Sequence, residues 1–490
     1  MTFVFSYRKY LSISVAVFLF ILLATLPGHV IHIDDSWFTE QAYWLVKDRV
    51  VRSELFSGLL GYEVHQLAYH KLHIWQDALF IKLFGFSAYS VKVIPLIYLT
   101  AFFALVFFYF KRYFPEKQRE AFLFLLAFLL VNALIVEHAF VNRPEIIVMF
   151  FGFASFFMLR RAIASQSLLW ISGSGILAGL AALTHLNGAS FIGAGFLFLL
   201  FRKNYRLALV FIPAAIFSFA FYFIDILPGG HFSEFLFQFR NDPALASSDF
   251  SIWDKLLKLF EEHKRFFRHP KEITFSLLFL FVFWIKRKAI SADPELRTVF
   301  LYLLCLFVVM GIISPGQKDY YLIYEMPYIA IIMGVTLADL GSMQCSIKIK
   351  QQRWLFGLMF LYVAVNVGHT IGVMRKQAPT PEFNAQVVER FGIRKGERVI
   401  APISMVFNQL KYLQIRGVGS YFLRARNGSF DLSQKNFFTA AADDGRAFIL
   451  IEKQPLAELG IVDPAIGDAF HGYRYLGNMP PYWVFKRISD

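Results

Sequence analysis

The chain has 490 residues, of which 57% are hydrophobic and 17% are charged, and its mean hydropathy is +0.51. These proportions exclude a soluble globule with an ordinary polar surface and indicate a polytopic membrane protein. The net charge of +14 comes from short basic clusters between apolar runs, a pattern typical of membrane topology signals and not of a nucleic-acid-binding surface.

Apolar runs that favour membrane-spanning helices recur from the N-terminus to about residue 375. We expect eleven spans, some shorter than the ~20 residues of an untilted helix, at 11–27, 90–110, 120–136, 145–159, 167–183, 187–201, 207–226, 271–285, 298–313, 321–340 and 354–371. The first run resembles a signal peptide, but the residues after it make a poor cleavage site, so we interpret it as an uncleaved span.

Every second junction between the spans is basic. The clusters are Arg8 and Lys9, then Lys111, Arg112, Lys117 and Arg119, then Arg160 and Arg161, then Arg202, Lys203 and Arg206, then Lys286 to Lys288, and then Lys348, Lys350 and Arg353. The positive-inside rule places these junctions and the N-terminus in the cytoplasm. The junctions 28–89, 137–144, 184–186, 227–270 and 314–320 then lie outside, together with the tail from about 376.

Two regions outside the spans have a pattern of their own. In the first outside loop, residues 36–49 predict a helix that lies at the membrane interface with its aromatic side chains on one side. The tail predicts a helix at 382–391, strands at 398–401 and 447–451, and a hairpin at 473–488. We therefore expect an all-α polytopic membrane domain over 1–375, with outside loops 28–89 and 227–270, followed by a small extracytoplasmic α/β domain over 376–490.

Acidic and basic side chains that could perform chemistry gather in the outside junctions. Asp34 and Asp35 follow the first apolar run, where a carboxylate can act as a general base at the bilayer surface, although either acid can instead be the N-cap of the next helix. Glu145 can orient a substrate hydroxyl, help to hold a metal or complement a helix dipole. Arg143 can hold Glu145 or a phosphate, or lie at the interface as an isolated cation.

Histidines and lysines add candidates for phosphate or metal binding. Five of the twelve histidines lie in the first outside loop, namely His29, His32, His65, His70 and His73. Zinc is conceivable there, but histidines with hydrogen-bonding or phosphate-binding roles are commoner. Lys71, and Lys318 with Tyr320 and Tyr321, favour phosphate binding over the alternative of solvated loop charges. The loop 227–270 offers further pocket residues: His231, Arg240, Arg265 and Arg268.

Four features follow one another in a recognisable order. They are Asp34-Asp35, the run LFGFSAYSVKVIPLI, Arg143-Pro144-Glu145 and the run KDYYLIYEMPYIAII. Over about residues 10–345 this order resembles the GT-C glycosyltransferases of the protein O-mannosyltransferase and lipid A aminoarabinose-transferase type. Two positions depart from that pattern: Tyr69 to His73 stand where members often have a His-Pro-Pro or Lys-Pro-Pro turn, and Asp-Asp stands where Asp-Glu is common.

The resemblance implies transfer of a sugar from a polyprenyl-phosphate carrier to a lipid, glycan or protein acceptor of the cell envelope, lipopolysaccharide included. The protein would lie in a bacterial inner membrane, with its site facing the periplasm or the cell exterior. Asp34, Asp35 and Glu145 would be catalytic. The donor phosphate would bind to Lys71, Lys318, Tyr321, Arg143 and His73. No cofactor is certain from the sequence, and a divalent metal stays open.

A transporter or flippase of lipid-linked sugars is the alternative from another functional class. Such proteins usually carry ionisable groups within their spans. Here the midpoints of the spans carry essentially none, because Asp225, Glu325 and Asp339 all lie near helix ends. A structural scaffold would leave the clustering of acids, histidines and lysines on one side unexplained.

Overall fold

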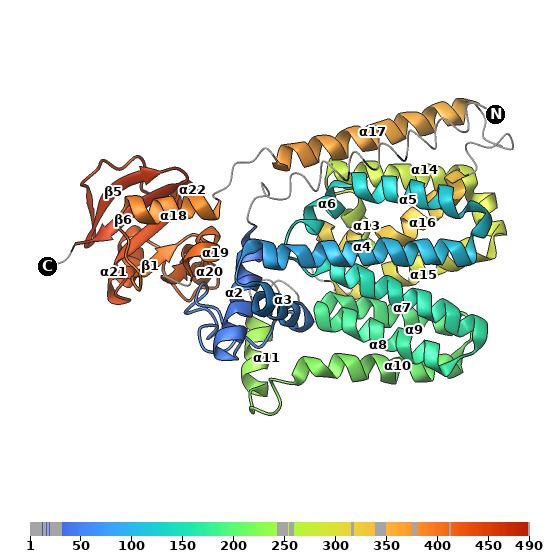
Figure 1. Ribbon diagram of the computed structural model, residues 1–490, viewed down its shortest axis with the longest axis horizontal. Helices are drawn as coiled ribbons and strands as arrows, with labels where there is room; N and C mark the ends of the chain where they lie inside the picture. Colours follow the sequence, from blue (N-terminus) through green and yellow to red (C-terminus); the bar gives the residue numbers. More distant parts are fainter. Residues whose placement is uncertain are drawn as a thin grey trace.

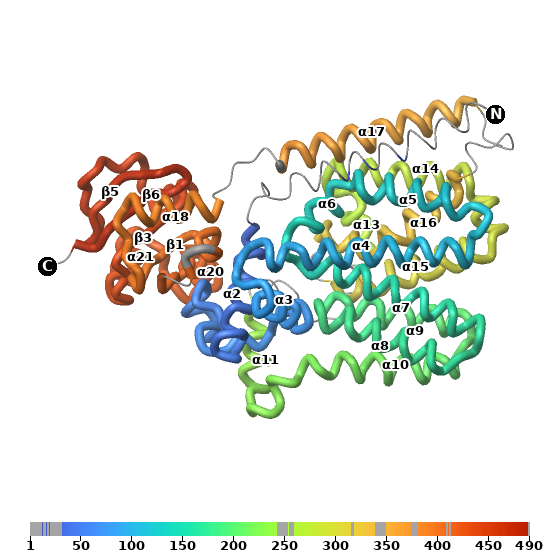
Figure 2. Tube along the Cα trace, viewed as in Figure 1, coloured from blue at the N-terminus to red at the C-terminus, as the bar shows by residue number. Residues whose placement is uncertain are grey.

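The computed structural model describes residues 12, 16, 19 and 32–488, apart from 243–252, 254–258, 315–317, 339–348, 375–379 and 411–412. A bundle of long helices forms one part of the molecule and a C-terminal sheet with its helices forms the other (Figure 1). Helices α2 (Ile33–Asp48) and α3 (Lys71–Phe84) lie where the two parts meet (Figure 2).

The longer helices of the bundle are α4 (Ala88–Tyr113), α5 (Gln118–Val131), α6 (Ala133–Ala139), α7 (Glu145–Ser165), α8 (Leu168–Thr184), α9 (Ala189–Phe201), α10 (Tyr205–Phe219), α14 (Pro270–Ala292), α15 (Pro294–Ile313), α16 (Met326–Leu337) and α17 (Ile349–Met374). The connections contain α11 (Phe232–Asn241), α13 (His263–Phe266), and 3-10 turns η2 (Pro115–Lys117), η3 (Leu186–Gly188), η4 (Ala220–Phe223) and η6 (Asp319–Tyr324). Side-chain caps explain several starts: Ser87 accepts from the Ser90 N–H, and Asp293 accepts from the N–H groups of Glu295 and Leu296.

Fewer described helices meet the length and apolarity of a membrane span than the sequence predicted. Five do so, namely α4, α7, Tyr205–Phe223, α15 and Ile349–Val373, and a sixth is present if α5 and α6 form one broken span. The segments expected at 167–183, 187–201 and 321–340 are the shorter apolar helices Leu168–Thr184, Leu186–Phe201 and Met326–Leu337. The segment expected at 271–285 lies in α14, and the one at 11–27 lies largely outside the described residues. The chain is an integral membrane protein with several apolar helices.

The run 120–136 was expected as one straight span, but the chain bends by 73° between α5 and α6. Asn132 ends α5 and caps α6, because its side-chain oxygen accepts from the N–H groups of Leu134 and Ile135 at 3.0 and 3.4 Å. The side chain of Asn366 in α17 accepts from the Ala133 N–H at 2.9 Å, so the backbone N–H groups at the start of α6 all have hydrogen-bond acceptors. An asparagine pair thus stabilises the break.

The C-terminal part is a mixed α/β unit, as the sequence predicted. Its strands are β1 (Arg398–Ala401), β2 (Gln414–Gly417), β3 (Phe448–Glu452), β4 (Ala469–Phe470), β5 (Tyr473–Met479) and β6 (Tyr482–Arg487), and its helical segments are α18 (Pro381–Arg390), η8 (Ile403–Met405), α19 (Val406–Gln409), α20 (Val418–Arg426), α21 (Gln434–Asp443) and α22 (Lys453–Glu458). The strand order is β2-β1-β3-β6-β5-β4, parallel among the first three and antiparallel elsewhere. The predicted helix, two strands and hairpin are all confirmed.

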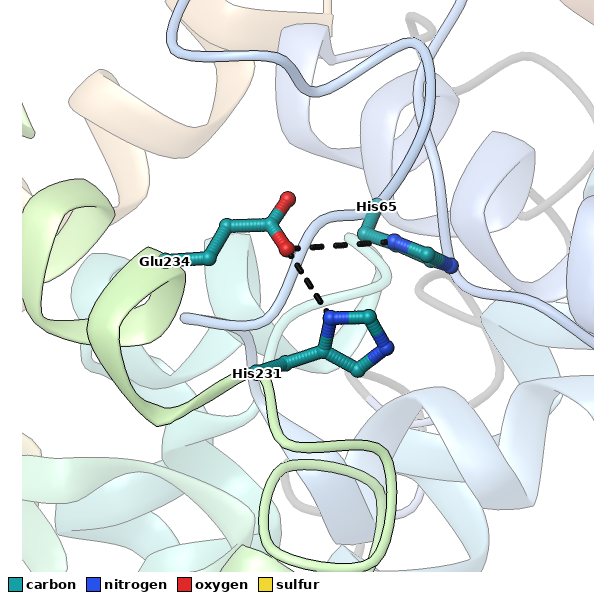
Figure 3. Close-up of side chains that lie close together, drawn as sticks. All are labelled: His65, His231 and Glu234. Carbon is teal, nitrogen blue, oxygen red and sulfur yellow. Dashed lines mark hydrogen bonds and ion pairs between the residues drawn. The ribbon is translucent and has the colours of Figure 1, made fainter.

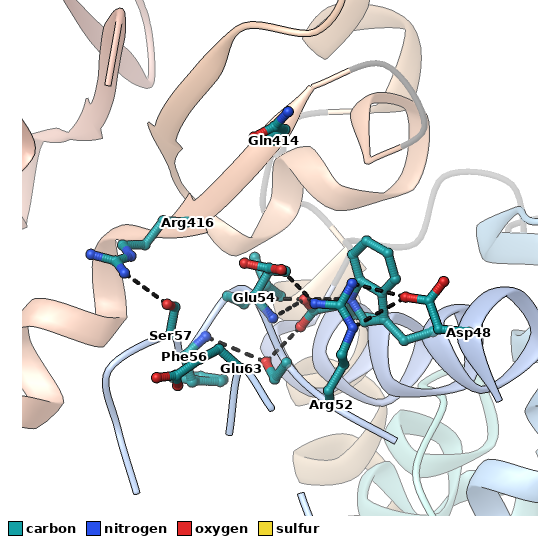
Figure 4. A network of polar contacts seen from close by, with 12 residues as sticks. Asp48, Arg52, Glu54, Phe56, Ser57, Glu63, Gln414 and Arg416 are labelled. Carbon is teal, nitrogen blue, oxygen red and sulfur yellow. Dashed lines mark hydrogen bonds and ion pairs between the residues drawn. The ribbon is translucent and has the colours of Figure 1, made fainter. Parts of the chain in front are cut away.

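The first outside loop completes the core of this C-terminal unit. Trp44, Leu55 and Phe56 pack in one buried cluster with residues of β1, β2, β3 and β6. The Gly417 N–H donates to the Leu55 carbonyl at 3.0 Å, and a Cβ at Gly417 would meet that oxygen at 2.5 Å, so only glycine fits. Arg416 donates to the Ser57 hydroxyl at 2.7 Å (Figure 4).

Buried Glu40 fastens the same loop to α2. Its carboxylate accepts from the Ser53 hydroxyl and the Glu54 N–H, both at 2.6 Å, and from the Leu55 N–H at 3.1 Å. Burial raises the pKa of Glu40 to about 7, although these donors oppose the shift. The C-terminal unit, the loop and α2 are therefore held together, which fixes the direction of the helix that carries Asp34.

The topology can be tested with reporters that are active only outside the cytoplasm. We expect a fusion after Gln377 to be active and a fusion after Lys350 to be silent, because the basic cluster around residue 350 is retained in the cytoplasm. Reporter activity normalised to expression is the measurement. A silent fusion after Gln377, or an active one after Lys350, would contradict the outside location of the C-terminal unit and of the junctions.

Candidate active site

The acidic pair lies in the first turn of α2, because this helix begins at Ile33 and not at residue 36 as the sequence predicted. The N-cap is His32, whose Nδ1 accepts from the Asp34 N–H at 3.1 Å, while the Asp35 carboxylate accepts from the His32 N–H at 2.7 Å. Both acids therefore lie near the positive end of the helix dipole. The alternative that one of them is the N-cap is wrong, although Asp35 does form the return bond of a capping box.

The Asp35 side chain is fully buried, and within the described part of the chain its carboxylate contacts only groups that belong to the protein's own helices and loops. Besides the His32 N–H, its carboxylate contacts the Lys92 ammonium at 3.0 Å and accepts from the Asn142 N–H at 2.5 Å. No part of Asp35 is exposed. The residue therefore joins the start of α2 to α4 and to the segment before α7, and it has no free side towards solvent.

Asp34, Arg143 and Glu145 form a connected cluster beside it. The Arg143 guanidinium donates to both Glu145 oxygens at 3.1 and 2.6 Å, and its other terminal nitrogen donates to Asp34. The Glu145 side chain is fully buried, whereas the side chains of Arg143 and Asp34 are 15% and 17% exposed. Burial raises the pKa of Asp34, and the charge of Arg143 opposes this shift. Asp34 is thus the one predicted catalytic acid with an accessible carboxylate.

Aromatic side chains from distant segments surround this cluster. The Arg143 guanidinium lies over the Tyr320 ring at 4.5 Å, and the Tyr320 and Tyr321 rings are 4.5 Å apart. The Tyr321 hydroxyl is 3.2 Å from Nε2 of His185, whose ring stacks on His70 at 4.4 Å. The first outside loop, the junction after α8 and the segment 318–324 therefore meet at one place.

A second, fully buried layer lies behind these residues. Nε2 of His73 is 3.8 Å from Asp77, and Asn142 donates to the same Asp77 oxygen at 2.6 Å. Burial lowers the pKa of His73 to about 3, so its imidazole is neutral near pH 7, and burial raises the pKa of Asp77. His73 was predicted to bind phosphate, but here it faces Asp77 and Phe38 and is not exposed.

Lys71 is buried and already has an anionic partner. Its ammonium contacts both oxygens of Asp225 at 2.5 and 2.8 Å, and the Tyr69 hydroxyl donates to Asp225 at 2.8 Å. Burial lowers the pKa of Lys71 to about 8, while Asp225 opposes this shift. A phosphate at Lys71 would therefore have to compete with Asp225 for the ammonium group.

Lys318 stands at the start of η6 with an exposed side chain. Its carbonyl accepts from the buried Arg265 at 2.6 Å, and Arg265 is paired with Glu262 at 2.6 Å. Arg265, predicted as a pocket residue, thus fixes the backbone of the loop that presents Lys318. Arg240 and Arg268 are exposed.

Comparison with known proteins shows which fold and which family the chain resembles. Residues 72–226 match the family profile described as dolichyl-phosphate-mannose-protein mannosyltransferase. Over these residues the chain is similar to a family of GT-C membrane glycosyltransferases. The sequence has no significant match among curated proteins.

Solved structures agree with this assignment at the level of the fold. ArnT from Cupriavidus metallidurans, solved bound to undecaprenyl phosphate, superposes with a TM-score of 0.64 at 12% identity, covering 98% of each chain. The oligosaccharyltransferase AglB from Archaeoglobus fulgidus, solved with an inhibitory peptide and a dolichol-phosphate, gives 0.51 at 10% identity over 91% of this chain and 70% of its own.

The geometry of the site divides the predicted residues into groups. Asp34 and Glu145 both contact Arg143, and Tyr320 and Tyr321 lie beside this cluster. Lys71 instead contacts Asp225, and His73 faces Asp77. The sequence analysis missed residues that the structure brings in: His138, His185, Lys92, Asn142 and Asp77. His138 and His185 stand in junctions predicted to lie outside, and that position was the signal that could have found them.

The predicted histidine cluster is divided as well. His70 stacks on His185, His73 faces Asp77, and His29 lies outside the described residues. In the described part of the chain, the side chains with suitable spacing for a metal ion are His65, His231 and Glu234 (Figure 3).

Proposed function

We propose that this glycosyltransferase moves a sugar from a polyprenyl-phosphate carrier to an acceptor outside the cytoplasm. The observation that carries the proposal is the cluster of Asp34, Arg143 and Glu145, which combines an accessible carboxylate with a fixed guanidinium. Two structural relatives, ArnT and AglB, were solved with undecaprenyl phosphate and a dolichol-phosphate bound, and this supports the same class of donor here.

The reaction requires a base for the acceptor. As the acceptor oxygen forms a bond to the anomeric carbon of the sugar, its proton passes to Asp34, and the bond from that carbon to the phosphate oxygen breaks with its electron pair on the phosphate. Asp34 suits this role because it is partly exposed and burial raises its pKa. Glu145 is fully buried and holds Arg143 through two hydrogen bonds, so it is a positioning residue.

Negative charge collects on the carrier phosphate as the bond breaks. Arg143 and Lys318 are the cations that can meet this charge from the cluster and from the η6 loop, and Tyr321 offers a hydroxyl. Lys71 adds a further cation if it exchanges Asp225 for the phosphate. His73 is neutral and does not contact the phosphate in this proposal; it packs against Asp77 in the buried layer behind the site.

The acceptor is a lipid, glycan or protein on the outer side of the membrane that holds the carrier. Nucleotide sugars are not normally supplied on that side, so the activated sugar arrives on the lipid. The chain of the carrier would lie along the bundle, where aromatic and aliphatic side chains such as Phe217, Phe221 and Leu209 are exposed on helix surfaces. A bacterial inner membrane is the setting we propose.

A transfer assay in liposomes tests this proposal. We would add synthetic polyprenyl-phosphate hexoses and pentoses to the full-length protein with a cell-envelope extract as acceptor, and measure the release of polyprenyl phosphate. Release that depends on both donor and extract is the expected result. Efficient transfer from a soluble nucleotide sugar with the lipid donor ignored would overturn the proposal, and movement of intact donor across the bilayer without release would favour a flippase.

Replacing Lys318 by Ala should impair release of polyprenyl phosphate with a larger effect on kcat than on binding, because its charge matters most as the phosphate leaves. We expect a loss of about tenfold or more, as one cationic contact contributes roughly 1.5–3 kcal/mol. Lys435→Ala, which removes an exposed lysine of the C-terminal unit, is the matched control. Equal activities of the two variants would exclude Lys318 from the donor site.

A further inference from the structure

Two distant segments of the chain meet at His65, His231 and Glu234 (Figure 3). His65 lies in the first outside loop, His231 is the N-cap of α11 and Glu234 lies in its first turn. One Glu234 oxygen is 3.1 Å from Nδ1 of His231 and 3.9 Å from Nδ1 of His65. The proposed sugar transfer uses none of these three residues.

The three side chains offer the ligand set of a zinc site. One ligand atom from each residue can be chosen so that all lie within 4.8 Å of one another. A tetrahedral ion with bonds of about 2.0–2.1 Å needs neighbouring ligand atoms roughly 3.3 Å apart, so small side-chain rotations would suffice. Two imidazole nitrogens and one carboxylate favour zinc over magnesium or calcium, which prefer oxygen ligands throughout.

The backbone around these residues is fixed by contacts that need no metal. Buried Gln238 of α11 donates to the His65 carbonyl at 2.6 Å and accepts from the Leu67 N–H at 2.8 Å. Phe235 of the same helix packs in a buried cluster that contains Leu67. The ligands are therefore presented from a preformed junction, which lowers the cost of assembling a metal site.

Partly exposed ion pairs do not by themselves explain this arrangement. The side chains of His65, His231 and Glu234 are each about one-third exposed, and pairs of this kind contribute little to stability. His65 and His231 also line a cavity of about 250 Å³ with Arg49, Trp75 and Asp225 among its other walls. An ion held by the three residues would border this cavity, which leaves room for water in the fourth coordination position.

We propose that His65, His231 and Glu234 bind one zinc ion, which fastens α11 to the first outside loop. The ion would join the same two segments that Asp225 joins through Lys71 and Tyr69. It would therefore stabilise the wall of the cavity next to Lys71, independently of which sugar or acceptor the enzyme uses.

Metal content of the full-length protein tests the site directly. The protein, purified in detergent without a histidine tag and dialysed against buffer with trace zinc, should hold one zinc per chain by inductively coupled plasma mass spectrometry. His231→Ala and Glu234→Gln should lose the ion, whereas His471→Ala, which removes an exposed histidine of the C-terminal unit, should retain it. Size-exclusion profiles identical to the wild type show that the variants are folded.

Cobalt substitution adds a readout of the ligand set. The wild type loaded with Co²⁺ should show visible absorption typical of four-coordinate nitrogen and oxygen ligands, and added zinc should raise its Tm by a few degrees. Both effects should vanish in His65→Asn and His231→Ala. A wild-type protein that takes up no zinc, or variants that retain it, would overturn the proposal. Because metal content does not depend on transfer, failure of the donor assay would leave this test unaffected.

Discussion

Replacing Asp34 by Asn should lower the rate of sugar transfer by about 10²- to 10⁴-fold, which is the usual contribution of a general base. Asn keeps the shape of the side chain and its contact with Arg143, but it cannot accept the acceptor proton. The partial exposure of Asp34 gives a substrate hydroxyl access to it. Release of polyprenyl phosphate under single-turnover conditions is the measurement, with binding of undecaprenyl phosphate followed in parallel and expected to change little.

Asp35→Asn is the matched control for this prediction. Asp35 is fully buried and contacts Lys92 and the N–H groups of His32 and Asn142, so its loss should lower Tm by several degrees and reduce the amount of folded protein. Asp34→Asn should leave Tm nearly unchanged. If well-folded Asp34→Asn retains near-normal transfer while Asp35→Asn loses it, the roles of the two acids are exchanged and our assignment is wrong.

The acids and the cation of the cluster could be found in the sequence because their positions relative to the apolar runs predict that they lie at one membrane face. The sequence could not show which of Asp34 and Asp35 has structural contacts only and which has an accessible carboxylate. That difference depends on Lys92 and Asn142, which are 57 and 107 residues away from Asp35. The start of α2 was also missed, because His32 is a less common N-cap than the aspartates that follow it.

The same reason explains the unexpected state of Lys71. A lysine in an outside loop suggests a free cation, but Asp225 lies 154 residues further along the chain and the fold brings the two together. In the C-terminal unit, β1, β3 and the hairpin of β5 and β6 were predicted from their apolar patterns, whereas β2 and β4 were not. β2 is short and half polar, and it is held in place by β1 and by Leu55 of the first loop. Contacts with residues distant in sequence therefore determine the state of Lys71 and the position of β2, and the local sequence pattern does not reveal such contacts.

Glu145→Gln should be the next most damaging change after Asp34→Asn, and it should act on both stability and catalysis. The Glu145 side chain is fully buried, and its two hydrogen bonds fix the Arg143 guanidinium. Removing one partner of a buried ion pair costs about 3–5 kcal/mol, because the remaining charge loses its compensation. Gln can accept only one of the two hydrogen bonds and carries no charge, so Asp34 would draw the guanidinium onto the base and away from the donor phosphate.

Arg143→Lys separates the charge of this cluster from its geometry. A lysine keeps the positive charge but cannot reach Asp34 and both Glu145 oxygens at once, as the guanidinium does. We therefore expect Arg143→Lys to reduce transfer nearly as strongly as Glu145→Gln, with a smaller loss of Tm. The double variant Arg143→Lys with Glu145→Gln should be little worse than either single change, because both remove the same contact. Additive losses in kcat/KM would show that the two residues act independently, and Glu145 would then need a role of its own at the substrate.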